Sequence, residues 1–395
     1  MRVPLFDLTR QYEALRTEIM SAVDRVFSSG QLILSEEVAA FETEIAARLG
    51  AGEAIGVANG SDALYIALKA IHIREGDYVI TTPYTFFATV SAIVRNRAIP
   101  LFTDIDPITM NIDLDQVEHL LQTHPQRHRI KAFIPVHLFG QTCDLDRLAS
   151  IRSVYGLRVI EDIAQSIGST WIDKAARVRH SGTVGDLGTL SFFPTKNLGA
   201  FGDAGMILSS DPELATFCRS FRVHGSKERY FHDEIGVNSR LDEVQAAILR
   251  IKNRRLDEWT EKRITNAGIY HRLFSDQKEL SGRFAYPRTY RDRRHIFHQY
   301  VIVLQEDRRE ALKTFLNQNG IGTSIYYPLP LHLQKCFAFL GGRPGDFPVS
   351  ELAAKRSLAL PMFPELTEEE IGYVADRMNT FFRQHPANDT SDEKE

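Results

Sequence analysis

The chain has 395 residues, enough for one large α/β domain with a smaller one, or for two or three domains of average size. Hydrophobic residues make up 43% and charged residues 25% of the sequence, and 47 Lys and Arg against 51 Asp and Glu give a formal net charge of −4. This balance excludes an intrinsically disordered chain and a general affinity for nucleic acid, so any basic site must be local.

The cysteines and the apolar runs indicate the kind of compartment in which the protein works. Cys143, Cys218 and Cys336 lie far apart and form no CxxC pair, which argues against a disulfide framework or a zinc ribbon and favours a reducing compartment. No apolar run reaches the roughly 18 residues that a membrane span needs, and the N-terminus lacks the apolar region of a signal peptide. We therefore expect a cytoplasmic protein with no membrane contact.

Short β-rich runs alternate with helical patterns between about residue 50 and residue 210. The alternation predicts βαβ units, and the apolar character of both strand faces predicts a buried, mostly parallel sheet with helices on both sides. Two helices with apolar residues at helical spacing are expected at 61–73 and 85–96. The predicted strands are 52–59, 77–83, 99–105, 130–137, 157–163, 189–193 and 205–210.

The pattern changes after a long helical segment at 241–274, which contains no proline and which we expect to lead out of the sheet domain. We predict a large domain over 1–250 and a smaller α+β domain over 251–384. The smaller domain would contain extended segments and helices at 298–304, 309–320, 321–328, 347–358 and 367–383. The polar tail at 385–395 is predicted to be disordered.

Polar groups follow several of these strands, where open α/β sheets form their ligand crevices. The turn from Asn59 to Asp62 could hold a phosphate on its backbone N–H groups, although an ordinary helix cap has the same sequence. Asp162 ends an apolar run, where a carboxylate needs a cationic partner or backbone amides. Gln165 offers an amide to the same ligand, or is simply a turn residue.

Lys196 follows the strand at 189–193 and precedes a loop with three glycines. A lone loop lysine is ordinarily solvated. Close to aromatic residues and a phosphate turn, however, a partly desolvated amine is a candidate Schiff-base nucleophile. Pyridoxal phosphate would use all these features together: a lysine for its aldehyde, an anion site, a carboxylate for its ring nitrogen, and an aromatic face supplied by residues 84–89.

Other chemistries fit the sequence less well. It contains no nucleotide phosphate loop, no HExxH and no GxSxG, and the glycine runs at 182–188 and 199–205 lack the dinucleotide spacing. His295, His298 and His332 could be imagined as metal ligands, but core or surface histidines explain them as well, and we predict no metal site.

Seven motifs, in order along nearly the whole chain, resemble those of the DegT/DnrJ/EryC family of pyridoxal-phosphate-dependent nucleotide-sugar aminotransferases, which have the fold-type I aminotransferase fold. The chain departs from the usual pattern at Ile163, Ala204 and Ser61, which are small steric changes. The motifs are VANGSDAL, TTPYTFFAT, DIDPITMNID, IPVHLFGQTCDLD, VIEDIAQS, SFFPTKNLGAFGDAG and GVNSRLDEVQAAIL.

The resemblance implies a role for each matched residue. Lys196 would be the Schiff-base lysine and proton carrier, Asp162 the partner of the pyridinium nitrogen, and Gln165 the partner of the ring's phenolic oxygen. Asn238 would reach the phosphate across a homodimer interface, so that two subunits share each active site. The remaining cofactor contacts would be the phosphate-binding Gly60, Ser61 and Ser191 and the stacking ring of Phe86, and the candidate substrate contacts are His137, Arg229, Tyr326 and His332.

The implied reaction is a ping-pong transamination. An amino acid, usually glutamate in this family, leaves its nitrogen on the cofactor as pyridoxamine phosphate, and a nucleotide-linked keto-sugar then accepts it. The expected product is an amino sugar for a surface polysaccharide or a glycosylated metabolite. The motif forms favour amination at C3 of a UDP- or dTDP-linked 3-oxo sugar, and amination at C4 is the alternative. Two other classes stay open: a non-catalytic regulator on the same fold, and a Rossmann oxidoreductase, for which the required glycine fingerprint is absent.

Overall fold

The computed structural model describes residues 1–386, and the sheet alternation predicted from the sequence is present in it. The helices are α1 (Leu8–Ser29), α2 (Glu36–Leu49), α3 (Gly60–Ala70), α4 (Phe87–Arg95), α5 (Leu114–Thr123), α6 (Leu145–Tyr155), α7 (Pro212–Phe221), α8 (Glu243–Asn253), α9 (Leu256–Asp276), α10 (Arg309–Gln318), α11 (Pro348–Arg356) and α12 (Glu368–Gln384). The strands are β1 (Glu53–Val57), β2 (Tyr78–Thr81), β3 (Ile99–Phe102), β4 (Ile130–Phe133), β5 (Arg158–Asp162), β6 (Thr170–Ile172), β7 (Val178–His180), β8 (Leu187–Ser191), β9 (Gly205–Ser209), β10 (Ser226–Glu228), β11 (Phe231–His232), β12 (Phe284–Ala285), β13 (Arg293–Arg294), β14 (Tyr300–Leu304) and β15 (Ser357–Leu360).

The central sheet has seven strands in the order β1-β9-β8-β5-β4-β2-β3. Each of these seven strands overlaps one of the seven predicted runs, although β8 begins and ends two residues earlier than predicted. The expected mixed α/β class with a mostly parallel sheet is confirmed. One strand departs from the parallel arrangement: β9 runs antiparallel to both β1 and β8. The carboxyl ends of β5 and β8 therefore lie at the same edge of the sheet.

Successive side chains of a strand face opposite layers of helices, and this alternation places the polar groups of the site. On β5, Ile160 packs in the core formed with α3, α4 and α7, whereas Val159 packs on the opposite face with α5 and α6. By the same alternation, Asp162 faces the α3 and α4 layer and Glu161 faces the α5 and α6 layer. The two adjacent carboxylates thus point to opposite sides of one strand.

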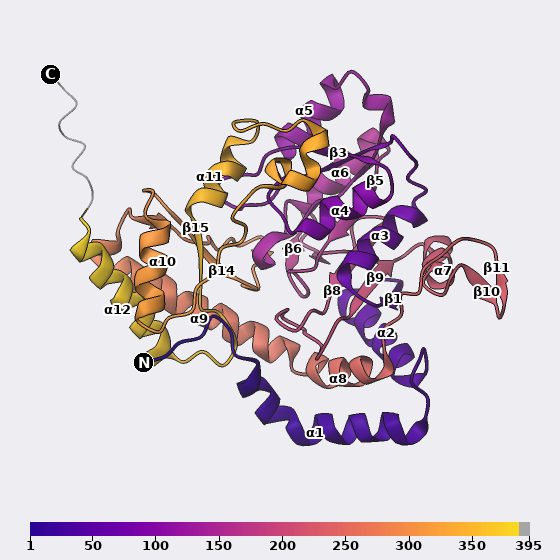
Figure 1. Ribbon diagram of the computed structural model, residues 1–395, viewed down its shortest axis with the longest axis horizontal. Helices are drawn as coiled ribbons and strands as arrows, with labels where there is room; N and C mark the ends of the chain where they lie inside the picture. The colour runs from indigo at the N-terminus through magenta and orange to yellow at the C-terminus, as the bar shows by residue number, and fades with distance from the viewer. Residues whose placement is uncertain (387–395) are drawn as a thin grey trace.

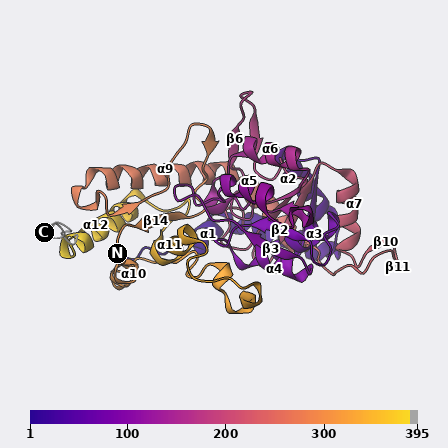
Figure 2. The same cartoon turned by 90° about the horizontal axis from the view of Figure 1, so that it is seen from above.

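A second body is built on the three-stranded antiparallel sheet β12-β14-β15, whose apolar side chains share a core with α9, α10 and α12. Figure 1 shows this body beside the large sheet, with α9 extending from α8 along the second body and the β10–β11 hairpin at the far end of the molecule. Figure 2 shows the same separation from above. The first residues of the chain also join the second body, because Val3 exchanges backbone hydrogen bonds with Gly320 and Gly322.

The long helix expected at 241–274 is two helices, α8 and α9, which are separated at Arg254 and Arg255. No glycine or proline marks the break. Its physical reason lies in another element: Arg48 of α2 donates to the side-chain oxygen of Asn253 at 2.7 Å and to its carbonyl at 2.9 Å, which satisfies the end of α8. The predicted domain boundary after residue 250 falls inside α8, and the change of direction comes at the break.

The expectation of a disordered tail concerns residues 385–395, most of which lie outside the described residues. Within residues 1–386, none of the helices combines the length and the apolar character required to cross a membrane.

Candidate active site

Asp162 is a buried carboxylate at the carboxyl end of β5. Its Oδ2 accepts a hydrogen bond from the Thr89 hydroxyl of α4 at 2.9 Å, and its Oδ1 accepts one from the Ala164 amide at 3.1 Å. Burial raises the pKa of Asp162 above its ordinary value, while these two hydrogen bonds and the nearby Lys196 act in the opposite direction. The carboxylate is therefore held rigidly in a place where a cationic partner would stabilise its charge.

Lys196 lies in the loop between β8 and β9, partly buried and close to Asp162. Burial lowers the pKa of Lys196 to about 8, against the opposing attraction of Asp162. The loop is tight: a Cβ atom at Gly199 would lie 2.2 Å from the Pro194 carbonyl oxygen, so glycine is required there. The buried Lys252 of α8 donates to the Gly199 carbonyl and fixes the loop from behind.

An anion cradle lies at the start of α3. Asn59 caps this helix by accepting from the Asp62 amide at 2.8 Å, while the amides of Gly60 and Ser61 belong to the first turn, where a helix offers no internal acceptor. A Cβ atom at Gly60 would lie 2.7 Å from the Cβ of Ser191, so the end of β8 closes against the helix. Three of the predicted phosphate contacts are thus brought together at a positive helix end.

Gln165 connects three segments around Asp162. Its Oε1 accepts from the Phe139 amide at 2.8 Å, and its Nε2 donates to the Tyr327 hydroxyl at 3.0 Å. Burial raises the pKa of Tyr327, so its hydroxyl stays protonated. Phe86 stands at the start of α4 with 55% of its surface exposed and its ring centroid 6.1 Å from that of Tyr327. An exposed aromatic face therefore borders the group of Asp162, Gln165 and Lys196.

Tyr326, a candidate substrate contact, directly precedes Tyr327, whose hydroxyl accepts from Gln165. The Tyr326 carbonyl accepts from the Tyr84 hydroxyl at 2.6 Å, and Tyr326 lines a small pocket together with Thr195 and His298. His298 is held by Asn197, with 2.9 Å between His298 Nδ1 and Asn197 Oδ1. Burial and the nearby Lys196 keep the pKa of His298 well below its ordinary value, so this imidazole is neutral.

Arg229 lies on the β10–β11 hairpin, exposed and stacked on its neighbour Tyr230, with 5.0 Å between the guanidinium carbon and the ring centroid. The hairpin projects from the far end of the molecule (Figures 1 and 2). One chain therefore does not bring Arg229 to Lys196.

His137 and His332 have structural partners instead of an open position. His137 is fully buried: its Nδ1 accepts from the Cys143 amide at 3.1 Å, and its Nε2 lies 2.8 Å from Glu161. His332 is 2% exposed, with Nε2 at 3.1 Å from Glu351. Both rings are buried, so this geometry gives no support to direct substrate contact by either of them.

Asn238 is exposed, and its backbone forms an isolated antiparallel bridge with Val223. The next residue, Ser239, accepts from the Ala58 amide at 3.1 Å and donates to Asp62 at 2.9 Å. The segment therefore packs against the α3 turn of its own chain, and contact between Asn238 and a second subunit stays a prediction.

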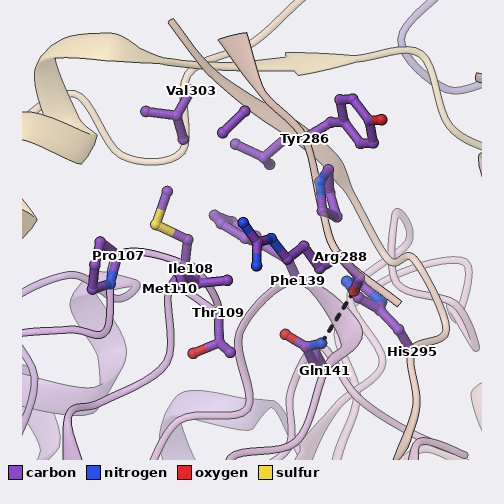
Figure 3. A pocket seen from close by; sticks show the side chains of 13 residues that line it. Pro107, Ile108, Thr109, Met110, Phe139, Gln141, Tyr286, Arg288, His295 and Val303 are labelled. Atoms are coloured by element: carbon purple, nitrogen blue, oxygen red, sulfur yellow. Dashed lines mark hydrogen bonds between the residues drawn. The ribbon is translucent and has the colours of Figure 1, made fainter. Parts of the chain in front are cut away.

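A separate pocket lies between the two bodies, and none of the predicted site residues lines it. Figure 3 shows Ile108 and Met110 of one loop facing Val303 of β14, with Arg288 and Gln141 pointing into the same space. The two sites meet at Phe139, which lines this pocket and whose amide donates to Gln165.

The sequence reasoning did not single out Thr89 and Tyr327, which hold Asp162 and Gln165. Thr89 stands inside a quoted motif, TTPYTFFAT, but a threonine at a helix start carries no signal of its partner. Among residues 1–386, no three His, Cys, Asp or Glu side chains gather as a metal site, and His295 instead stacks on Phe297 with ring centroids 4.0 Å apart.

A partly desolvated lysine beside a buried carboxylate, with an anion cradle at a helix N-terminus, defines a class of enzyme that forms covalent links between lysine and a carbonyl compound. The chain belongs to the DegT/DnrJ/EryC1/StrS aminotransferase family, whose family model matches residues 13–379. The protein is therefore an aminotransferase, of a family that depends on pyridoxal phosphate, and the expected family is confirmed.

Three similar proteins illustrate the relationship. A "pleiotropic regulatory protein" of Geobacillus stearothermophilus is 49% identical over 97% of this chain and 99% of its own length. A UDP-N-acetyl-3-dehydro-alpha-D-glucosamine 3-aminotransferase of Acidithiobacillus ferrooxidans is 40% identical over 94% and 96%. The crystal structure of NtdA from Bacillus subtilis with bound cofactor PMP is 30% identical, has a TM-score of 0.88, and covers 97% of this chain and 86% of that one.

Proposed function

We propose that this aminotransferase binds pyridoxal phosphate at Lys196 and transfers an amino group from an amino acid to a nucleotide-linked keto-sugar. The observation that carries the proposal is the side chain of Lys196, whose pKa is lowered to about 8 by burial while it lies close to Asp162. An amine of this kind is partly neutral near physiological pH, and only the neutral amine is a nucleophile and a base.

The residues around Lys196 fit the cofactor. Gly60, Ser61 and Ser191 would hold its phosphate, because the first turn of α3 leaves amide donors free and Ser191 closes the cradle. Phe86 would cover one face of the ring, and Asp162 would lie at the ring nitrogen, where a positive charge offsets the cost of its burial. When bound, pyridoxal phosphate supplies an aldehyde that condenses with amines and a ring that accepts electrons.

The chain's own groups then handle protons and exclude water. Lys196 Nζ accepts and returns a proton, which its lowered pKa favours near neutral pH. Gln165 is held between the Phe139 amide and the Tyr327 hydroxyl, so its amide has a fixed direction. Tyr326 and the neutral His298 border the adjoining pocket, where a sugar hydroxyl would find a donor and an acceptor.

The preferred acceptor is a UDP- or dTDP-linked 3-oxo sugar, with glutamate as donor. The relative from Acidithiobacillus ferrooxidans, which is named as a 3-aminotransferase of a UDP-linked sugar, supports amination at C3. Amination at C4 of a 4-keto-6-deoxy sugar is the alternative. A product of either kind would enter a surface polysaccharide or a glycosylated metabolite.

A regulator that binds the cofactor or a sugar without turnover is the second candidate, favoured by the name of the relative that is 49% identical. Against it, Lys196, Asp162 and their supporting hydrogen bonds are all in place, and a non-catalytic binding protein would not require a lysine of lowered pKa. We therefore prefer the enzyme.

The test compares the visible absorbance of purified wild type, Lys196→Ala and Lys174→Ala in the presence of pyridoxal phosphate. Lys174 is exposed, so its replacement controls for the loss of one lysine. We expect the band in wild type and Lys174→Ala only, and we expect glutamate to bleach it. A band that persists in Lys196→Ala would overturn the assignment. A band that no amino acid bleaches, with no keto-sugar converted, would favour the regulator.

Wild-type protein with pyridoxamine phosphate would then be offered UDP- and dTDP-linked 3-oxo and 4-keto sugars, with the aminated carbon identified by mass spectrometry and NMR. Turnover of 4-keto sugars alone would replace the C3 proposal by the C4 alternative.

We also propose that the enzyme is a homodimer in which Asn238 of each subunit contacts the phosphate held by the other. The exposure of Asn238 and of its neighbour Ile235, which is 99% exposed, supports a partner at this surface.

A further inference from the structure

Glu161 is a fully buried carboxylate on the opposite face of β5 from Asp162. Its Oε1 accepts from the amides of Val184 and Gly185, both at 2.7 Å. Its Oε2 accepts from the Gly182 amide at 2.9 Å. Burial opposes ionisation, but His137 and these amides outweigh it and hold the pKa of Glu161 below its ordinary value. One carboxylate thus binds the whole loop that leads into β8.

His137 completes the set of donors to Glu161. Its Nδ1 accepts from the Cys143 amide, so Nε2 carries the ring proton and donates it to Glu161 at 2.8 Å. The same residue holds the backbone of Asp162, since the His137 amide donates to the Asp162 carbonyl at 3.0 Å and the Asp162 amide donates to the Pro135 carbonyl at 2.9 Å. His137 therefore contacts both carboxylate residues of β5.

We propose that Glu161 and His137 form a positioning pair that fixes the end of β5 and thereby orients the Asp162 carboxylate. The inference rests on the proposed function, in which Asp162 lies at the cofactor's ring nitrogen. Neither side chain touches substrate or cofactor. They act through Asp162. The amide of His137 binds the Asp162 carbonyl, and the Glu161 side chain binds the strand to the 182–185 loop.

The pair also reaches the second polar group of the site. Two residues after His137, the Phe139 amide donates to Gln165. Because His137 anchors this segment, the direction of the Gln165 amide depends on the same anchor. Loss of the pair would therefore disturb Asp162 and Gln165 together, while leaving the α3 cradle and its three phosphate contacts intact.

The chain offers a matched control in Asp186, another buried carboxylate attached to β5. It accepts from the Val159 amide at 2.8 Å and from Arg152 and Arg158, near the start of the strand instead of its end. Asp186→Asn and Glu161→Gln each remove a buried charge that binds this strand, so a purely structural loss should look alike in both. Only Glu161→Gln should affect Asp162.

The experiment measures wild type, Glu161→Gln and Asp186→Asn as pyridoxal-phosphate-bound proteins. We expect the pH midpoint of the cofactor's visible band to move by about one unit in Glu161→Gln, because Asp162 no longer meets the ring nitrogen at a fixed angle. We expect kcat to fall about tenfold while KM for the keto-sugar changes less than about twofold. Asp186→Asn should lower thermal stability with neither change.

A spectral midpoint and a kcat in Glu161→Gln equal to those of Asp186→Asn would overturn the proposal and leave the pair a structural one. Should Glu161→Gln fail to fold, His137→Gln and His137→Leu repeat the comparison, since glutamine keeps a donor for Glu161 and leucine does not. Rescue of the spectral midpoint by His137→Gln alone supports the pair, and equal values in both variants overturn it. Failure of wild type to give a Lys196-dependent band would instead reject the proposed function itself.

Discussion

The side chain of Lys196 combines two opposing influences, and their balance predicts how its reactivity depends on pH. Burial favours the neutral amine, Asp162 favours the charged one, and the resulting pKa is about 8. Below this value the amine is protonated and unreactive. In cofactor-free protein, we therefore expect acetylation of Lys196 by acetic anhydride to rise with pH through a midpoint of about 8.

Mass spectrometry of the labelled peptides checks this prediction, with the exposed Lys174 as an internal reference for the reagent. Asp162→Asn removes the attraction that favours the charged amine, so the Lys196 midpoint should move to lower pH. A midpoint that stays unchanged, or that rises, in Asp162→Asn would show that the two groups do not interact.

Thr89 gives a second prediction at the same scale. Its hydroxyl donates to Asp162 at 2.9 Å and lowers the pKa of that carboxyl. Thr89→Val should therefore raise the pKa of Asp162 further and weaken the interaction between this carboxylate and the cationic ring nitrogen of the cofactor. A hydrogen bond to a charged group contributes about 1.5–3 kcal/mol. We expect the dissociation constant for pyridoxal phosphate to rise at least about tenfold in a fluorescence titration. Thr89→Ser keeps the hydroxyl and should bind nearly as wild type does; equal binding by the valine variant would contradict the prediction.

The position of a side chain relative to the site could be predicted from the sequence for residues at strand ends. It could not be predicted for residues whose orientation depends on a partner distant in the chain. Asp162, Ser191 and Gly60 could be placed because strand and helix ends share one edge of a parallel sheet. His137 also follows a strand, but its ring turns toward Glu161 on the far face, and no local pattern states which face a residue past the strand end will choose.

Among the elements, the seven strands of the central sheet were predictable because apolar β-rich runs alternate with helical patterns. The direction of β9 was not, since an antiparallel strand and a parallel one have the same residue pattern when both faces are buried. The break between α8 and α9 was missed for a related reason: its cause is Arg48 of α2, some two hundred residues away. Packing between distant elements overrides local propensity at such points.

The first turn of α11 shows the same dependence on a distant residue and gives a testable case. Asp104, in the motif DIDPITMNID, accepts from the amides of Val349 and Ser350 at 2.9 and 2.8 Å and from the Ser350 hydroxyl at 2.5 Å. The residue at the N-cap position itself, Phe347, forms no capping hydrogen bond with its side chain. Asp104 thus caps a helix of the second half of the chain from the large sheet.

We expect Asp104→Ala to destabilise α11 by about 1–2 kcal/mol, the usual cost of removing a helix cap. Hydrogen–deuterium exchange should accelerate across 348–356 because the capped amides lose their acceptor. Asp211→Ala is the matched control, since Asp211 caps α7 locally through the amides of Glu213 and Leu214. Its effect should be confined to 212–221. Unchanged exchange in α11 in the Asp104 variant would show that the cap contributes nothing.

At the scale of the whole molecule, exposed apolar side chains gather at one end of the molecule, in the segment that leads to Asn238. Tyr230, Phe231 and Ile235 are 78%, 67% and 99% exposed, and they belong to the projecting β10–β11 hairpin and to the irregular segment that follows it (Figure 1). Large side chains seldom remain in water together unless they meet a partner. This arrangement motivates the last prediction, that each active site contains groups from two subunits.

The test mixes two inactive proteins. Lys196→Ala dimers lack the lysine in both sites, and Asn238→Ala dimers lack the phosphate contact in both. A mixed dimer contains one chain of each kind. One of its sites combines Lys196 of the Asn238→Ala chain with Asn238 of the Lys196→Ala chain and is wild type. The other site carries both substitutions. Random exchange makes half of the dimers mixed, so about a quarter of the wild-type transaminase activity should return.

Subunit exchange is verified separately by mass spectrometry of differently tagged chains, and exchange without recovered activity would place Asn238 outside the partner's site. Because Ser239 packs against the α3 turn of its own chain through Asp62, a contact within one subunit is the competing arrangement, and it predicts that mixing adds nothing to the activities of the separate proteins.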